Sequence, residues 1–224
     1  MGSNKAGRYL KYALGEIILV VLGILIALSI NNWQQEIKNK KLERRYLTDL
    51  LGDLRKDSVM LNTLYSESIR ASASKDSLVA YLENSHTYTE SIPEHFREQW
   101  NPYKVFTPNE TTIEEMKSSS NVSIIRNDNL RRSIVELYSN YDYFLQDEGL
   151  YMASTRDIFK MAKETLVNIN EPSPQELETL LRSPLMSNTI RKNFANGRME
   201  SVGAISGECH SVMEKIKDYL NSPN

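Results

Sequence analysis

A single uninterrupted apolar run near the N-terminus stands out from the alternation of apolar and polar positions along the chain. Residues 17–30 read IILVVLGILIALSI, and Ser29 is the one polar side chain among these fourteen. Fourteen helical residues rise about 21 Å, which is less than the ~30 Å hydrocarbon core of a bilayer. The nineteen residues 12–30 rise about 28 Å, with Glu16 near one end. The run therefore predicts a transmembrane helix, which we place at residues 12–33.

Aromatic and basic residues stand at both ends of this predicted membrane helix. Amphipathic rings and long cationic side chains favour the interface between lipid and water. The interfacial anchors that we expect are Tyr9, Lys11, Tyr12 and Trp33. A cleaved signal peptide is the alternative, because residues 5–11 hold three cations and residues 27–29 resemble a weak cleavage site. We favour a retained anchor, because the helical pattern continues beyond that site.

Apolar positions after the membrane segment follow a helical period. Residues 13–92 contain no proline and only three glycines, which predicts an almost continuous helix from about 10 to 83. Residues 1–11 would form a short tail and residues 34–83 a long helix or stalk. Two interpretations stay open, a bundle helix that packs on its own domain or a coiled-coil stalk that joins protomers. The apolar stripe, with Asp57 at one of its positions, consists of Leu47, Leu50, Leu54, Leu61 and Leu64.

Residues 84–224 combine helical patterns with helix-start signals. Capping boxes lie at 107–110, 112–115 and 173–176, and Asn127 or Asp128 precedes a long pattern that ends near residue 168. We find no run of alternating β-branched residues. The sequence therefore predicts an all-α fold, in which the transmembrane helix continues into a long amphipathic helix and a helical bundle follows. The part of the chain beyond the membrane helix would be a bundle of about four or five helices, in which residues 84–224 pack with residues 45–83.

Composition and charge restrict the function. The chain has 27 Lys+Arg against 29 Asp+Glu and is 40% hydrophobic, which excludes a polytopic membrane protein and a highly basic nucleic-acid binder. One cysteine excludes an intramolecular disulfide and a multi-cysteine zinc site, and three histidines leave little for a His-based site. Serines 118–120 lack a nucleophile elbow. We expect a non-enzymatic protein with no catalytic or metal-binding residue, no cofactor and no nucleic-acid partner.

Glu16 is the most informative single residue, because a carboxylate within a membrane helix is by default a functional candidate. Helical spacing aligns it with two small residues, and the small-xxx-small pattern of Gly23 and Ala27 permits close contact between helices. The stripe that we predict to associate in the membrane is Glu16, Val20, Gly23 and Ala27. The alternative is an interfacial Glu16 whose carboxylate snorkels to the headgroups.

Two other groups of residues suggest chemistry but favour packing. Cys209 and His210 are adjacent, so a helix turns them about 100° apart, and Cys209 lies on the apolar face of the last helix. We expect a buried thiol there. One predicted helix concentrates aromatic rings, which indicates core packing with hydroxyls at the surface more than a ligand pocket. These residues are Tyr138, Tyr141, Tyr143 and Tyr151, with Phe144.

Two stretches of the sequence carry a resemblance to a known family. Residues 11–33, KYALGEIILVVLGILIALSINNW, and residues 106–138, FTPNETTIEEMKSSSNVSIIRNDNLRRSIVELY, resemble segments of an uncharacterised family of single-pass membrane proteins from Bacteroidota. The first motif is specific, because it combines Gly15, Glu16, Gly23 and the Asn-Asn-Trp end. The sequence departs from the family pattern at Ser120, where that pattern has glycine. The resemblance implies a bacterial envelope protein and supplies no activity.

The charges on either side of the membrane helix bear on its orientation. Five cations within residues 38–45, interleaved with acids, outnumber the three at residues 5–11, but the latter lie closer to the span, and long domains translocate largely regardless of charge. We expect a bacterial inner-membrane protein with a cytoplasmic N-terminus and a periplasmic bundle. Its expected partners are the lipid bilayer, a second copy of itself and an envelope protein. We expect a scaffold or assembly subunit, with a sensor-type binding module as the alternative.

Overall fold

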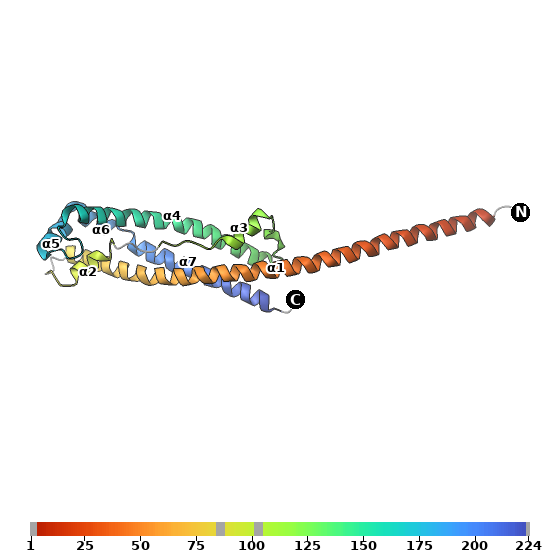
Figure 1. Ribbon diagram of the computed structural model, residues 1–224, viewed down its shortest axis with the longest axis horizontal. Helices are drawn as coiled ribbons and strands as arrows, with labels where there is room; N and C mark the ends of the chain where they lie inside the picture. The colour runs from red at the N-terminus through yellow and green to blue at the C-terminus, as the bar shows by residue number, and fades with distance from the viewer. Residues whose placement is uncertain (1–3, 84–87, 101–104, 223–224) are drawn as a thin grey trace. The chain divides into compact units, whose positions relative to one another are not determined.

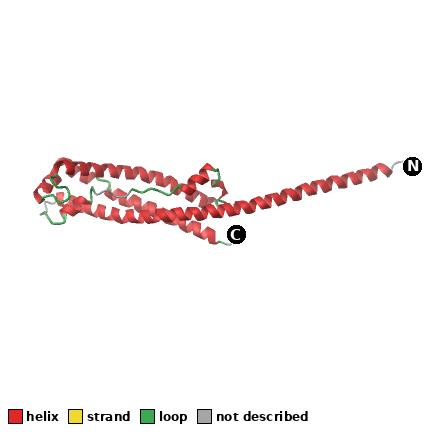
Figure 2. Ribbon diagram, viewed as in Figure 1, coloured by secondary structure: helices red, strands yellow, loops and turns green. Residues whose placement is uncertain are grey.

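The computed structural model is helical throughout the residues that it describes, which are 4–83, 88–100 and 105–222, with side chains from residue 14 onward. No strand occurs in these ranges, which confirms the predicted all-α fold (Figure 2). The elements in chain order are α1 (Asn4–Glu83), α2 (Ile92–Arg97), α3 (Thr111–Ser118), the 3₁₀ helix η1 (Val122–Ile124), α4 (Asp128–Thr165), α5 (Pro174–Arg182), α6 (Pro184–Lys192) and α7 (Ala195–Asn221).

The chain divides into two compact units, residues 1–48 and residues 49–224, and α1 contributes to both. In the first unit, an 18-residue window of α1 has a mean hydropathy of 2.4, and none of it is buried. The helix is therefore long and apolar enough to cross a membrane. This agrees with the predicted membrane helix at 12–33 in length and composition.

The second unit is a bundle in which α4 and α7 lie along the last part of α1 (Figure 1). The leucine stripe supplies one side of its core, because Leu50, Leu54, Leu61 and Leu64 are fully buried. Polar contacts accompany this packing, and they include the pair of Ser58 Oγ and His210 Nε2 at 3.1 Å. The stripe is thus buried within its own domain, as the first of the two interpretations requires.

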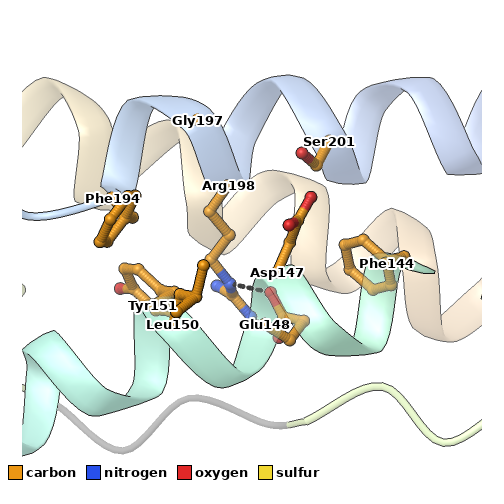
Figure 3. Close-up of a pocket in the computed structure, with 9 residues that line it drawn as sticks. All are labelled: Phe144, Asp147, Glu148, Leu150, Tyr151, Phe194, Gly197, Arg198 and Ser201. Carbon is orange, nitrogen blue, oxygen red and sulfur yellow. Dashed lines mark hydrogen bonds and ion pairs between the residues drawn. The ribbon is translucent and has the colours of Figure 1, made fainter. Parts of the chain in front are cut away.

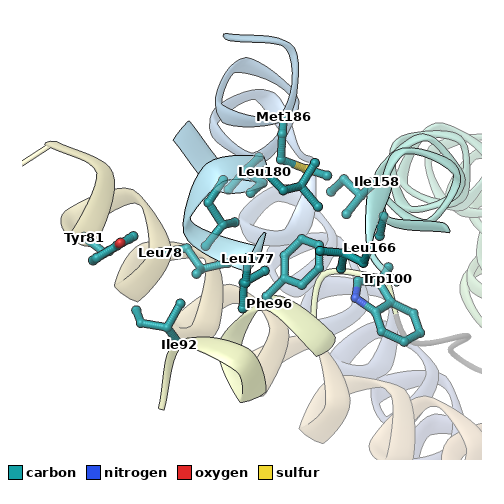
Figure 4. Close-up of a cluster of buried hydrophobic side chains, with 13 residues drawn as sticks. Leu78, Tyr81, Ile92, Phe96, Trp100, Ile158, Leu166, Leu177, Leu180 and Met186 are labelled. Carbon is teal, nitrogen blue, oxygen red and sulfur yellow. The ribbon is translucent and has the colours of Figure 1, made fainter. Parts of the chain in front are cut away.

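Short helices close one end of the bundle. A hydrophobic cluster there joins the end of α1 to α2, α5 and α6 (Figure 4). Trp100 packs on Phe159 of α4, with ring centroids 5.4 Å apart. We predict about four or five helices beyond the membrane helix, but residues 88–222 alone hold six α-helices, and two of these are short helices that begin at Pro174 and Pro184.

Several predicted helix starts are confirmed, and one is corrected. Ser173 and Glu176 form the expected capping box, and Asn127 accepts a hydrogen bond from the Leu130 backbone N–H. The boxes at 107–110 and 112–115 were wrong. Helix α3 begins at Thr111 and its N-cap residue makes no side-chain cap. The reason is tertiary, since carboxylates of α1 bind this helix end instead, as described below.

A Schellman motif ends α3. The Asn121 N–H donates to the Met116 carbonyl at 2.8 Å and the Ser120 N–H donates to the Lys117 carbonyl at 3.1 Å. Ser120 has φ of 56°, a left-handed conformation that glycine adopts without steric cost. The tight turn is therefore present although serine stands where the family pattern has glycine.

Replacing Ser120 by glycine should stabilise the protein. Relief of the left-handed strain exceeds the added chain entropy, so we expect a gain of roughly 0.5–1 kcal/mol in unfolding free energy. Chemical unfolding of the detergent-solubilised full chain, followed by circular dichroism, measures it. Ser123→Gly is the matched control, because Ser123 is exposed and lacks a positive φ, and it should lose stability. Equal losses in both variants would contradict the assigned conformation.

Candidate functional site

The predicted membrane stripe is fully available on the surface of the first unit. Glu16, Val20, Gly23 and Ala27 follow one another at intervals of four, three and four residues, so they share one face of α1, and all four are exposed. A Cβ at Gly23 would meet nothing within 4 Å. Trp33 is 64% exposed, as an interfacial anchor requires. The side chains of Tyr9, Lys11 and Tyr12 lie outside the described residues.

Cationic side chains follow the apolar segment. Lys38, Lys40, Lys41, Arg44 and Arg45 are all exposed. Their ammonium and guanidinium groups are suited to phosphate oxygens of a lipid surface. This unit of the structure therefore offers an apolar helix surface and an adjacent cationic one.

Inside the second unit, two carboxylates of α1 bind the segment that leads into α3. Asp57 Oδ1 accepts hydrogen bonds from the backbone N and side-chain Nδ2 of Asn109, at 2.9 and 2.6 Å. Asp53 Oδ2 accepts from the backbone N and Oγ1 of Thr112, at 3.3 and 2.6 Å. These bonds satisfy N–H groups at the start of α3 that a local cap would otherwise serve. We call the four residues the Asp53–Asp57 clasp.

Aromatic and thiol groups surround the clasp. Tyr138 donates its hydroxyl to the Asn109 carbonyl at 3.2 Å, and Tyr141 is fully buried. Burial raises the pKa of both phenols far above the usual value, and the acidic groups nearby act in the same direction. Burial also raises the pKa of the Cys209 thiol to about 11. All three groups are therefore protonated at neutral pH.

The carboxyl group of Asp57 is costly to ionise in this cluster. Its side chain is fully buried, and desolvation raises its pKa, an effect that the hydrogen bonds from Asn109 oppose without cancelling. The negative charge of Asp53 adds to the rise. A carboxyl whose pKa is higher in the folded than in the unfolded state stabilises the fold at low pH. That contribution is lost as the pH rises through the folded-state pKa.

We expect Asp57→Asn to change how stability depends on pH. The amide keeps an oxygen acceptor for Asn109 but cannot ionise, so the variant escapes the cost of a buried charge above the folded-state pKa. At each pH, the midpoint of the unmodified protein is subtracted from the midpoint of the variant. This difference should be more positive at pH 7 than at pH 4. Thermal unfolding in detergent at the two pH values measures this difference. The exposed Asp142→Asn serves as control, and an equal offset at both pH values would contradict the assignment.

A second polar feature of the bundle is an ion pair between α4 and α7. Arg198 Nε and Nη2 donate to the two carboxylate oxygens of Glu148, at 2.6 and 3.0 Å (Figure 3). Both side chains are only 2% exposed. Arg198 also donates to Ser68 Oγ of α1 at 3.3 Å, and its guanidinium lies 4.6 Å from the centre of the Tyr151 ring. Arg198 of α7 thus contacts both of the other long helices, α4 and α1.

A cavity of about 160 Å³ adjoins this ion pair. It lies between α4 and α7, and Figure 3 shows Phe194 and Tyr151 at one end and Phe144 at the other. The carboxylate of Asp147 reaches from α4 toward α7, near Ser201 (Figure 3). We call this space the α4–α7 cavity. It combines apolar walls with converging polar groups, as small-molecule sites do.

The adjacent Cys209 and His210 have separate structural roles. Cys209 is fully buried, as predicted, and its Sγ donates to the Leu54 carbonyl at 3.6 Å. His210 Nδ1 lies 2.8 Å from the Ser206 carbonyl, which assigns the ring hydrogen to Nδ1 and makes Nε2 the acceptor for Ser58. Within the described residues, no three His, Cys, Asp or Glu side chains form a group that could hold a metal ion.

Sequence reasoning missed the ion pair and misjudged the aromatic helix. Glu148 and Arg198 lie 50 positions apart, so no local spacing connects them. The one available signal is that each falls on the buried face of its predicted helix, where an unpaired charge is costly. The hydroxyls of Tyr141 and Tyr151 were expected at the surface, but both are buried. Tyr151 and Phe144 line the α4–α7 cavity.

Comparison with known proteins assigns part of the chain to a family. Residues 16–158 match a protein family described as a family of unknown function (DUF6090). The matched residues include the apolar segment of α1 from Glu16, the Asp53–Asp57 clasp and most of α4. Neither a curated protein nor a solved structure matches the chain.

Proposed function

Because the chain belongs to DUF6090, a family of unknown function, we propose its role from its own residues: a non-enzymatic, membrane-anchored helical scaffold of the bacterial cell envelope. The apolar surface of α1 carries this proposal. Its large side chains from Leu14 to Ile30 are all about half exposed or more. So much apolar surface is stable in lipid and costly in water. The cations of residues 38–45 would bind headgroup phosphates beside it.

Self-association would follow from the stripe within this segment. Gly23 and Ala27 allow a second helix to approach closely, and dispersion contacts then replace contacts with lipid tails. Glu16, on the same face, would donate or accept a hydrogen bond across the pair. Each chain would thereby bring a helical bundle to a common site in the membrane. The role of the assembly would be to hold an envelope protein partner on these bundles.

Replacing Gly23 by leucine tests the assembly. The larger side chain separates the helices, so we expect the dissociation constant of the dimer to rise at least about tenfold. Light scattering of the full chain in detergent should show a shift from multiples of 25.7 kDa toward the monomer. Gly15→Leu is the matched control, because it makes the same change about 100° away from Glu16. A monomeric unmodified chain, or equal effects of both variants, would refute the proposed stripe.

The orientation that we propose places the N-terminus in the cytoplasm and the bundle in the periplasm of the inner membrane. A cysteine introduced at exposed Ser222 tests it in a Cys209→Ser background. A membrane-impermeant maleimide should label Ser222→Cys in cells whose outer membrane is permeabilised and whose inner membrane is intact. Labelling that requires lysis of the inner membrane would reverse the orientation. The unmodified chain is a suitable blank, because the thiol of Cys209 is buried.

The α4–α7 cavity favours a second candidate function, a sensor-type module that binds a ligand and signals through the membrane helix. Its charged and aromatic lining comes from two long helices, and ligand binding could alter their packing. In this model a partner protein would receive the signal. Ligand-dependent cross-linking to a second membrane protein would separate this role from a static scaffold.

A further inference from the structure

Gly197 contributes no side chain to the α4–α7 cavity. Gly197 lies on the wall of the cavity, and a Cβ there would meet nothing within 4 Å. A larger side chain at this position in the first turn of α7 would therefore enter open space beside the cavity.

The floor of the cavity is electrically neutral. Arg198 and Glu148 form a bidentate pair with both side chains 2% exposed, so their charges cancel at short range. The contact of the guanidinium with Tyr151 and its bond to Ser68 hold the pair in one geometry. An incoming ligand would thus meet a rigid floor without a free positive or negative charge.

Asp147 supplies the one net charge of the lining. No hydrogen bond or ion pair joins its carboxylate to another residue in the described part of the chain. In Figure 3 it extends between the two helices on the same side as Ser201. With Arg198 and Glu148 cancelling, the cavity carries a charge of about −1, which attracts a monovalent cation.

Aromatic rings form the apolar part of the walls. Phe144 and Tyr151 are buried in α4, and Phe194, at the start of α7, is half exposed at the mouth. The faces of such rings attract cations, most strongly when solvent is excluded. From the aromatic walls, the neutral floor and the unpaired carboxylate together, we propose that the α4–α7 cavity binds a small organic cation of the ammonium type.

The size of the cavity limits the ligand. An engineered protein cavity of about 150 Å³ holds one benzene molecule. The α4–α7 cavity, at about 160 Å³, therefore accommodates a trimethylammonium group or a compact primary amine and excludes a nucleotide or a folded peptide. The chemistry is shared by a free small molecule and by a choline-type lipid headgroup.

This inference is independent of the proposed scaffold role. Self-association depends on the stripe in α1, whereas ammonium binding depends on α4 and α7. A chain that fails to bind the cation could still associate, and a monomeric chain could still bind it. If the chain is instead a sensor-type module, a small organic ammonium ion would be the class of ligand that it detects.

Isothermal titration of the full chain in maltoside micelles tests the proposal with two probes. Choline carries the charge, and 3,3-dimethylbutan-1-ol is its neutral isostere. Choline should bind at least about tenfold more tightly than the alcohol, after subtraction of a micelle blank. Absence of choline binding, or equal affinity for the two probes, would overturn the proposal.

Two variants with matched controls assign the binding to this cavity. Asp147→Asn should remove the preference for choline, whereas Asp142→Asn should retain it, because Asp142 is an exposed acid of the same helix that does not line the cavity. Gly197→Leu should fill the space and abolish binding, whereas Gly207→Leu, also exposed on α7, should not. Unchanged binding in Asp147→Asn would refute the site, even if Gly197→Leu fails to fold.

A comparison of two lipid compositions distinguishes the sources of the ligand. The chain is placed in nanodiscs of phosphatidylglycerol or of phosphatidylcholine, and free choline is titrated into each. Equal choline affinity in both supports a soluble ammonium ligand. Weaker apparent affinity in phosphatidylcholine supports a headgroup that already occupies the cavity. Choline binding in neither nanodisc would contradict an ammonium site.

Discussion

Helix α1 carries two different side-chain patterns on one continuous backbone. Its backbone N–H and C=O groups bond within the helix, so the main chain is equally acceptable in lipid and in water. The side chains alone then decide the environment. Between residues 17 and 30 they are apolar except for Ser29, whereas from Leu50 onward a leucine stripe enters the bundle core and most of the other positions are polar. The first pattern lies in residues 1–48 and the second in residues 49–224, which are the two units of the chain.

The bundle places its polar groups where they fix the relation between helices. Asp53 and Asp57 determine where α3 begins, and Arg198 connects α4, α7 and α1. The buried ion pair of Arg198 and Glu148 adds little net stability, because desolvation offsets the attraction between the two charges. Removing one partner is nevertheless costly, since it leaves the other charge buried alone. Leucine side chains in the core would tolerate several registers of helix packing. We therefore infer that the clasp and the ion pair favour one of these registers over the others.

The sequence predicted those features that a few neighbouring residues determine. The leucine stripe, the Asn127 cap and the Ser173 capping box each follow from spacing within one or two helical turns, and the structure confirms them. The start of α3 was misplaced, because Asn109 and Thr112 bind carboxylates more than 50 positions earlier in the chain. The α4–α7 cavity was equally out of reach, since Asp147 and Gly197 become neighbours only once α4 and α7 have packed. Local spacing thus predicts where most helices lie. The clasp and the α4–α7 cavity depend instead on contacts between residues far apart in the sequence.

The burial of Cys209 determines how the chain responds to oxidising conditions. A thiol that stays protonated inside a packed core is a poor nucleophile, so the folded protein resists disulfide exchange. Once the bundle opens, the same thiol regains an ordinary acidity and contacts oxidants freely. Because the chain has no second cysteine, oxidation then links two molecules rather than two segments of one. A disulfide-linked dimer would therefore indicate that the bundles of both molecules had opened.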